Sequence, residues 1–169
     1  GFDWPSLPAT TFLQFARNGN RSNFETVSFG RRFKLNDLVI AECVEGKGRF
    51  LDDIVNGVWA ICEESFWGVP AHLNLQKAGS GLPDTAERTV DLFVAETFNL
   101  LAWTYYLIGE AFDDISPLIR PRIALEINQR GLIPLEGRED FGWMGFELNR
   151  PTSSGKPSTR RVNNWNPWI

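Results

Sequence analysis

The sequence predicts an all-α protein in which helical hairpins form two layers, and three observations lead to this prediction. Apolar residues in the segment 51–62 recur at spacings of three and four, as an amphipathic helix requires. The segment 89–108 is apolar on nearly every face, which is typical of a helix surrounded by protein. The helix predicted after it has one polar face. A buried helix followed by a helix with one solvated face is what a two-layer helical stack produces. No segment shows the alternating pattern of a strand.

The first part of the chain is expected to contain three helical regions. The first covers Ala9–Arg17 and ends at an Asn-Gly-Asn turn. The second runs from Ser22 to Val44 and is expected to be interrupted at Gly30–Arg32. The third is the amphipathic segment that begins near residue 51, and it is expected to end at the two glutamates 63–64.

An irregular segment is predicted over residues 65–88, and long loops of this kind inside compact domains are often functional. The apolar helix over 89–108 follows it. The next helix is predicted to have Ser116 as its cap, Pro117 at its first position and Gly131 at its end. Its apolar stripe consists of Ile115, Ile119, Ile123 and Ile127. From Leu132 to Arg161 the chain is expected to be rich in loops.

Composition and charge limit the classes of function. The length suits one domain over residues 1–169, and the net charge of −4 without a basic stripe argues against nucleic acid as a partner. The longest uncharged apolar run, Thr97–Ile108, is too short to cross a bilayer. Seven tryptophans and thirteen phenylalanines suit either a large core or a carbohydrate-binding cleft. Because no nucleotide fingerprint or zinc motif is present, we predict no cofactor and no metal.

The two cysteines, Cys43 and Cys62, have no metal-binding spacing. On two consecutive antiparallel helices they would lie roughly 13 Å apart along the helix axes, at a rise of about 1.5 Å per residue. That separation is beyond the reach of a disulfide. Both cysteines are therefore expected to be buried thiols. They do not indicate whether the protein resides in an oxidising or a reducing compartment.

The stretch Asn163-Asn164-Trp165-Asn166-Pro167-Trp168-Ile169 combines amides with indoles. An amide donates and accepts hydrogen bonds without carrying charge, so it suits a carboxylic acid or a sugar hydroxyl. An indole face can stack on a pyranose ring. Asn166 is a good N-cap and Pro167 fits the first helical position, so the stretch also matches the pattern of a helix start, and we expect the chain to be part of a longer protein. The alternative is a tail whose tryptophans cover the edge of a core.

Glu63, Glu64 and His72 form a second group of candidates, because paired carboxylates and an imidazole can transfer protons. The alternative is a structural role in which they cap the loop and hold it closed. His72 is the only histidine, and no partner spacing indicates a metal site. Arg160 or Arg161 can form an ion pair with an acidic sugar, or its charge can be solvated in a loop. The further candidates for substrate contact are Trp67, Trp143 and Arg160.

Four segments of the chain are distinctive as a set: Ala41–Asp53, Trp59–Glu64, Trp67–His72 and Asn163–Ile169. Together they resemble the heparinase II/III-like group, which consists of bacterial proteins related to polysaccharide lyases. The resemblance implies an incomplete α/α toroid, followed in the complete protein by an antiparallel β-sandwich domain that is missing here. It also implies a periplasmic or secreted location. The present chain would be one toroid domain, truncated at its C-terminal end.

Lyases of this kind cleave polysaccharides that contain uronic acid, glycosaminoglycans among them, by β-elimination. An Asn or His neutralises the uronate carboxylate, and a Tyr, often with a His, moves the proton. Related alginate lyases carry Asn-Asn-His where this chain has Asn163-Asn164-Trp165. The resemblance therefore implies that Asn164 is the catalytic carboxylate-binding residue and that Trp165 replaces the histidine. Because the tyrosine would lie beyond Ile169, we expect this segment to be inactive by itself.

Three hypotheses about function remain open at this point. The first is a polysaccharide lyase, with an acidic polysaccharide or oligosaccharide as its partner. The second is a glycoside hydrolase on a helical barrel, which needs two carboxylates across a cleft, and Glu63 with Asp84 or Glu96 are the available pairs. The third is a protein that binds acidic glycans without catalysis, suggested by Trp165. In the first and third hypotheses, Asn163 and Asn166 would also contact the glycan.

Overall fold

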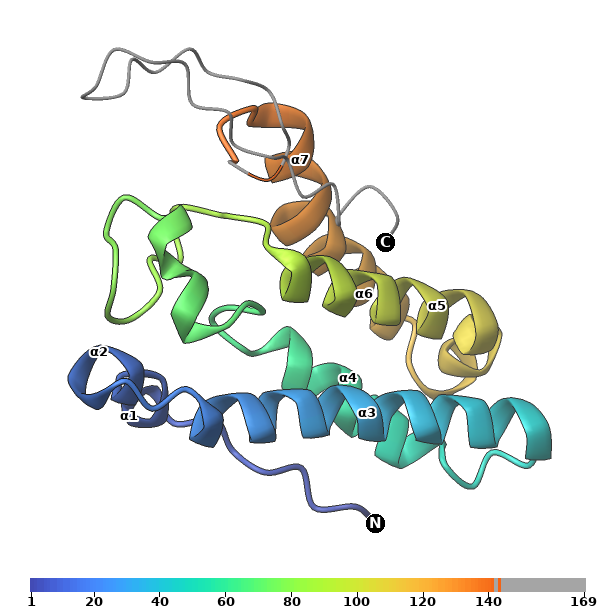
Figure 1. The fold of residues 1–169 in the computed structure, drawn as a ribbon. Coiled ribbons are helices and arrows are strands. Elements are labelled where there is room, and N and C mark those ends of the chain that lie inside the picture. Colours follow the sequence, from blue (N-terminus) through green and yellow to red (C-terminus); the bar gives the residue numbers. More distant parts are fainter. Residues whose placement is uncertain (142, 144–169) are drawn as a thin grey trace, which may run out of the picture.

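The computed structural model describes residues 1–141 and 143, and Figure 1 shows their arrangement. Within these residues the chain forms helices joined by turns and loops, and no strand, which confirms the predicted all-α class. None of the helices in this part of the chain has the length and apolar character needed to cross a membrane. The elements are α1 (Ala9–Phe12), α2 (Gln14–Asn18), α3 (Ser22–Glu45), α4 (Leu51–Cys62), the 3-10 helix η1 (Pro70–Leu75), α5 (Leu92–Ile115), α6 (Ile119–Ile127), the π-helix η2 (Asn128–Leu132) and α7 (Ile133–Gly137).

The core lies between the four longest helices. Helix α3 packs against both α4 and α5, and α5 packs against α6, which also contacts α4. Figure 1 shows α3 and α4 side by side, joined by a short turn. Gly46 ends α3 with a φ of 62°, in the left-handed region that favours glycine. Each of the four helices contributes to the largest fully buried aliphatic side chains of this core, which are Leu35, Ile54, Ile61, Leu101 and Ile123.

The first residues of the chain are held against α3 and α4. The indole Nε1 of Trp4 donates a hydrogen bond of 3.2 Å to the carbonyl of Asp53. The ring of Trp4 lies so close to Gly57 that a Cβ on that glycine would meet it at 2.3 Å. Arg31 of α3 donates from Nε to the carbonyl of Pro5 at 2.8 Å. The first residues of the chain are therefore part of the folded domain.

The predicted interruption of the second helix is wrong. Helix α3 runs without a break from Ser22 to Glu45, and Gly30 lies on its exposed side with open space around its Cα. Arg31 and Arg32 point inward and are buried. They tolerate burial because both form ion pairs with Glu64, as described below. A local pattern of charge suggested a break, whereas a partner distant in sequence keeps the helix intact.

Other helix boundaries also differ from the prediction. The first helix is divided into α1 and α2 at Leu13. Helix α5 begins later than expected because the side chain of Asp91 caps it, accepting a hydrogen bond from the backbone N–H of Val94 at 2.8 Å. Gly131 does not end the following helix, since α6 continues through the π-turn η2 into α7. The third helix does match its prediction, because α4 covers residues 51–62.

The prediction that the apolar helix is surrounded by protein is wrong for one face of α5. Trp103, Tyr106 and Leu107 are 54%, 76% and 47% exposed. The indole and phenol rings meet edge to face, with centroids 5.8 Å apart, so each covers part of the other. Only one stripe of the helix faces the core. The buried apolar residues of that stripe are Val94, Ala95, Leu101, Ile108 and Phe112.

The two cysteines have different environments, and both are free thiols. Cys62 is buried as predicted, but Cys43 is exposed on α3, which corrects the expectation that both are buried. Burial is the largest influence on Cys62, and with the nearby charge of Glu126 it raises the pKa of the thiol to about 12, against a smaller opposing influence of Arg122. Folding therefore disfavours the reactive thiolate at this position.

We predict that a thiol reagent labels only Cys43 in the native protein and labels Cys62 only after unfolding. The reason is that the raised pKa of Cys62 and its burial remove both thiolate and access. Mass spectrometry of protein labelled with and without denaturant measures this, with Cys43→Ser as the control that should stay unlabelled when native. Because the folded pKa is the higher one, stability from this group is present below about pH 9 and is lost as the pH rises towards 12. Equal labelling rates for the two thiols would contradict the prediction.

Candidate functional site

A histidine–aspartate pair connects the loop segment to the start of α5. Nδ1 of His72, in η1, lies 2.6 Å from Oδ2 of Asp91. The other oxygen of Asp91 accepts the capping hydrogen bond from Val94 N–H, so the carboxylate is fixed at the positive end of the helix dipole. A carboxylate in this position holds the proton on Nδ1, and Nε2 of His72 is left as an acceptor. The His72 side chain is 37% exposed, so part of the imidazole is accessible from the surface.

The local sequence explains how the loop reaches Asp91. Pro70 stands at the start of η1, where its fixed φ suits the first helical turn. Gly68 precedes it, and a Cβ there would lie 2.9 Å from Oδ2 of Asp91 and 2.6 Å from the ring of Phe66. A larger residue would therefore push the chain away from the carboxylate. The segment 68–72 is built to place the imidazole beside the N-terminus of α5.

An aromatic groove adjoins this pair, between α3 and α5. It has a volume of about 180 Å³. The ring of Phe93 joins the groove to the pair, because it stacks on His72 with centroids 5.4 Å apart and also lies 4.9 Å from Phe29. Phe33 is 69% exposed at the surface. The residues that line the groove are Phe29, Arg32, Phe33, Phe93 and Glu96.

The two charged residues of the groove differ in how far their side chains are engaged by the rest of the protein. Arg32 donates from Nε to Thr97 at 2.9 Å and from Nη2 to Glu64 at 2.7 Å, so its charge is directed into the protein. Glu96 belongs to an exposed part of α5, but the neighbouring rings partly desolvate its carboxyl. Burial is the largest influence that raises the pKa of Glu96, the charge of Asp91 adds to it, and Arg32 opposes it.

Glu64 serves the interior of the protein. Its carboxylate receives Nη1 of Arg31 at 2.9 Å and Nη2 of Arg32 at 2.7 Å, and its side chain is 4% exposed. Both of its oxygens are therefore occupied by guanidinium groups. Glu63 is exposed at the end of α4 and is separated from this cluster. The adjacent glutamates thus point to different environments and do not form a pair of acid and base.

Trp67 is also directed inward. It is 1% exposed, and its indole Nε1 donates to the carbonyl of Ile61 at 2.8 Å. The guanidinium of Arg130 lies over the ring at 4.8 Å from its centroid. This cation–π contact occupies the ring, so a sugar has no access to stack on it. Arg130 also donates to the carbonyls of Cys62 and Glu64 at the C-terminal end of α4, where positive charge suits the helix dipole.

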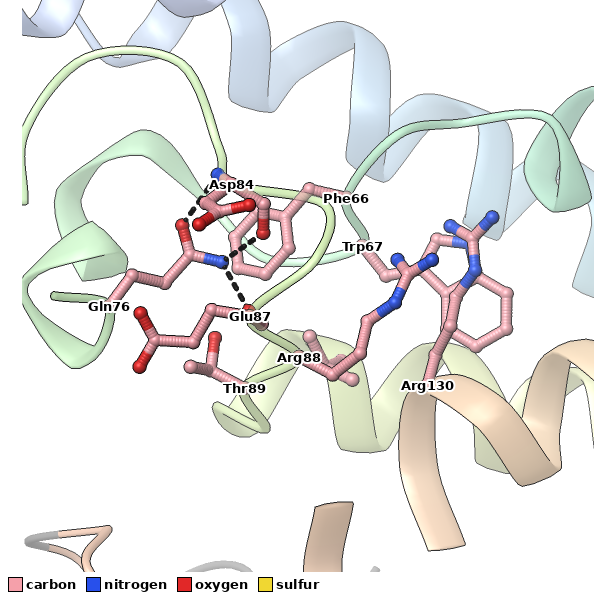
Figure 2. A pocket seen from close by; sticks show the side chains of 9 residues that line it. Phe66, Trp67, Gln76, Asp84, Glu87, Arg88, Thr89 and Arg130 are labelled. Carbon is pink, nitrogen blue, oxygen red and sulfur yellow. Dashed lines mark hydrogen bonds between the residues drawn. The ribbon is translucent and has the colours of Figure 1, made fainter. Parts of the chain in front are cut away.

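A second cavity lies beside Trp67 and has a volume of about 10 Å³, which is room for one water molecule. Figure 2 shows how Gln76 closes the loop there: its amide nitrogen donates to the carbonyls of Asp84 and Glu87 at 2.9 and 2.7 Å, and its oxygen accepts from Asp84 N–H. Thr89 Oγ1 is buried beside the cavity and has no hydrogen-bond partner within the described part of the chain. This cavity is too small for a sugar.

The remaining predicted site residues lie near or beyond the end of the described chain. Trp143 is partly buried: Nε1 donates to the carbonyl of Val90 at 2.7 Å and its ring stacks on Phe141 at 5.7 Å. In residues 1–141 and 143, no group of three or more His, Cys, Asp or Glu side chains could hold a metal ion. The candidates Asn163, Asn164, Trp165, Asn166 and Arg160 fall outside the described residues.

The structure therefore brings His72 to a groove that sequence reasoning did not identify. Asp91 was not among the predicted site residues, although its position before a run of apolar residues is a signal for an N-cap. The three phenylalanines of the groove come from two helices, so no local pattern joins them. Among known proteins, no family model matches this chain and no curated protein is significantly similar to it.

Proposed function

We propose that this chain is part of a polysaccharide lyase that cleaves uronic-acid-containing polysaccharide by β-elimination. In this proposal its helices form part of an incomplete α/α toroid with two layers, and the segment is inactive without the rest of the protein. One observation carries the proposal: a half-buried histidine, oriented by a buried carboxylate, lies beside an aromatic groove of about 180 Å³. A base fixed beside a groove is what proton abstraction from a bound sugar requires.

The proposed chemistry breaks two bonds of the uronate and forms one. A base removes the proton at C5, the electron pair forms the C4=C5 double bond, and the C4–O bond breaks, so that the leaving oxygen takes up a proton. His72 is the only histidine of the sequence, and its Nε2 is the proposed base or a partner of the tyrosine expected beyond Ile169. Asn164 is proposed to hold the uronate carboxylate, because a preorganised amide donor stabilises the developing enediolate.

The test uses the complete natural protein that contains this sequence. It should convert a uronate polymer into products whose new double bond, conjugated with the carboxyl group, absorbs ultraviolet light. Asn164→Ala should abolish this absorbance, whereas Asn36→Ala, an exposed amide on α3, should leave it unchanged. Saturated products would indicate a hydrolase instead, and binding of an acidic oligosaccharide without turnover would indicate a glycan-binding protein.

A further inference from the structure

We infer that the groove between α3 and α5 binds one uncharged sugar ring of a polymer. The choice of a polymer as the ligand rests on the proposed function. If it is correct, the substrate is a mixed polymer in which uronic acid occurs together with neutral sugars. A polymer made of uronic acid alone would place a carboxylate in the groove. Three properties of the groove lead to this inference: its rings, its charges and its size.

The rings offer an apolar surface to the outside. Phe33 is 69% exposed, and Phe29 and Phe93 lie together beside it with their planes tilted by 35°. Exposed apolar side chains that are gathered in a concave site and bordered by polar groups mark places of ligand binding. The C–H face of a pyranose ring is apolar, and it can cover such rings while its hydroxyl groups reach the polar border.

The charges of the groove favour hydroxyl groups over a carboxylate. Glu96 has no hydrogen-bond partner among the described residues, and its oxygens can accept bonds from sugar hydroxyls. A uronate would instead add a further negative charge near Glu96 and Asp91, and repulsion between like charges disfavours that. Arg32 directs its hydrogen bonds into the protein, because its guanidinium donates to Glu64, Thr97 and the carbonyl of Ser28. Among the described residues that line the groove, no cation is therefore free to form an ion pair with an acidic sugar.

The size of the groove fits a single ring. A volume of about 180 Å³ is below the range of about 300–1,000 Å³ that is usual for drug-sized ligands. One pyranose unit of a polymer fits such a space while the neighbouring units continue along the surface. The stacking of Phe93 on His72 connects this ring to the proposed base. The neutral sugar would thus be held close to the uronate that reacts.

The test measures binding by calorimetry, using the complete protein with neutral gluco-oligosaccharides, N-acetylhexosamine oligosaccharides and a homouronide of equal length. Neutral oligosaccharides should bind, and Phe33→Ala should lower their affinity at least about tenfold. That factor corresponds to about 1.4 kcal/mol of binding free energy. Ile40→Ala, a control on an exposed apolar residue of the same helix outside the groove, should have no effect. Glu96→Gln should allow the homouronide to bind, because it removes the charge and keeps the size.

Two outcomes would overturn the inference: no neutral sugar binds, or binding of every oligosaccharide survives Phe33→Ala. The inference and the proposed function can fail separately. Neutral binding that depends on Phe33, without any unsaturated product, would leave the groove assignment intact and reject the lyase. Unsaturated product formed from a mixed polymer with an unchanged KM in Phe33→Ala would support the lyase and reject the groove.

Discussion

Replacement of Glu64 by alanine is expected to lower the free energy of unfolding by about 3–5 kcal/mol, the usual cost of removing one partner of a buried ion pair. Glu64 is bound by the guanidinium groups of both Arg31 and Arg32, and the side chains of these arginines are only 8% and 10% exposed. Without the carboxylate, two positive charges remain close together in the interior. The hydrogen bonds from Arg31 to Pro5 and from Arg32 to Thr97 do not neutralise them.

Urea unfolding followed by circular dichroism measures this loss. Glu63→Ala is the matched control, because it removes the same group from the adjacent, exposed position, and it should change stability by no more than about 0.5 kcal/mol. The slope of the unfolding free energy against urea should be similar in both variants, since the folded core is retained. If the two variants lose equal stability, Glu64 does not neutralise the arginines as the structure indicates.

This cluster also shows why part of the fold was predictable and part was not. Helix α4 was predicted because its buried residues, Ile54, Val58 and Ile61, lie on one stripe that the sequence displays locally. The continuity of α3 was not predictable in the same way. Its charged residues Arg31 and Arg32 are accepted into the core only because Glu64, from a distant part of the chain, is there to pair with them. A contact of this kind leaves no periodic signal.

The candidate site shows the same limit at the level of single residues. Glu64, Trp67 and His72 are close in sequence and were all predicted as site residues, but the fold directs them differently. Glu64 and Trp67 serve the interior, since arginines occupy the carboxylate of the first and the ring of the second. His72 faces outward because Asp91 and Phe93, from the start of another helix, hold its ring. Residue type identified the candidates, and only tertiary contacts separated them.

Replacement of His72 by alanine is expected to reduce kcat of the proposed lyase by about 10²–10⁴-fold, the usual contribution of a positioned acid or base. Asp91→Asn is the sharper test. Asparagine is as good an N-cap as aspartate, so α5 should keep its cap and the protein its stability. The amide, however, presents its N–H group to Nδ1 of His72 if its oxygen continues to accept from Val94. The proton of the imidazole then moves to Nε2, and the base is lost.

Steady-state kinetics on a uronate polymer, combined with thermal unfolding, measures both effects. For Asp91→Asn we expect kcat to fall by a factor similar to that of His72→Ala, while KM and the unfolding temperature stay nearly constant, because only the proton-transfer step is changed. Lys77→Ala, an exposed residue just after η1, is the control that should keep full activity. A variant Asp91→Asn that keeps kcat but unfolds at a lower temperature would show that the pair only fastens the loop to α5. In that case another group would have to remove the proton, and the groove would be left as a binding surface without His72 as its base.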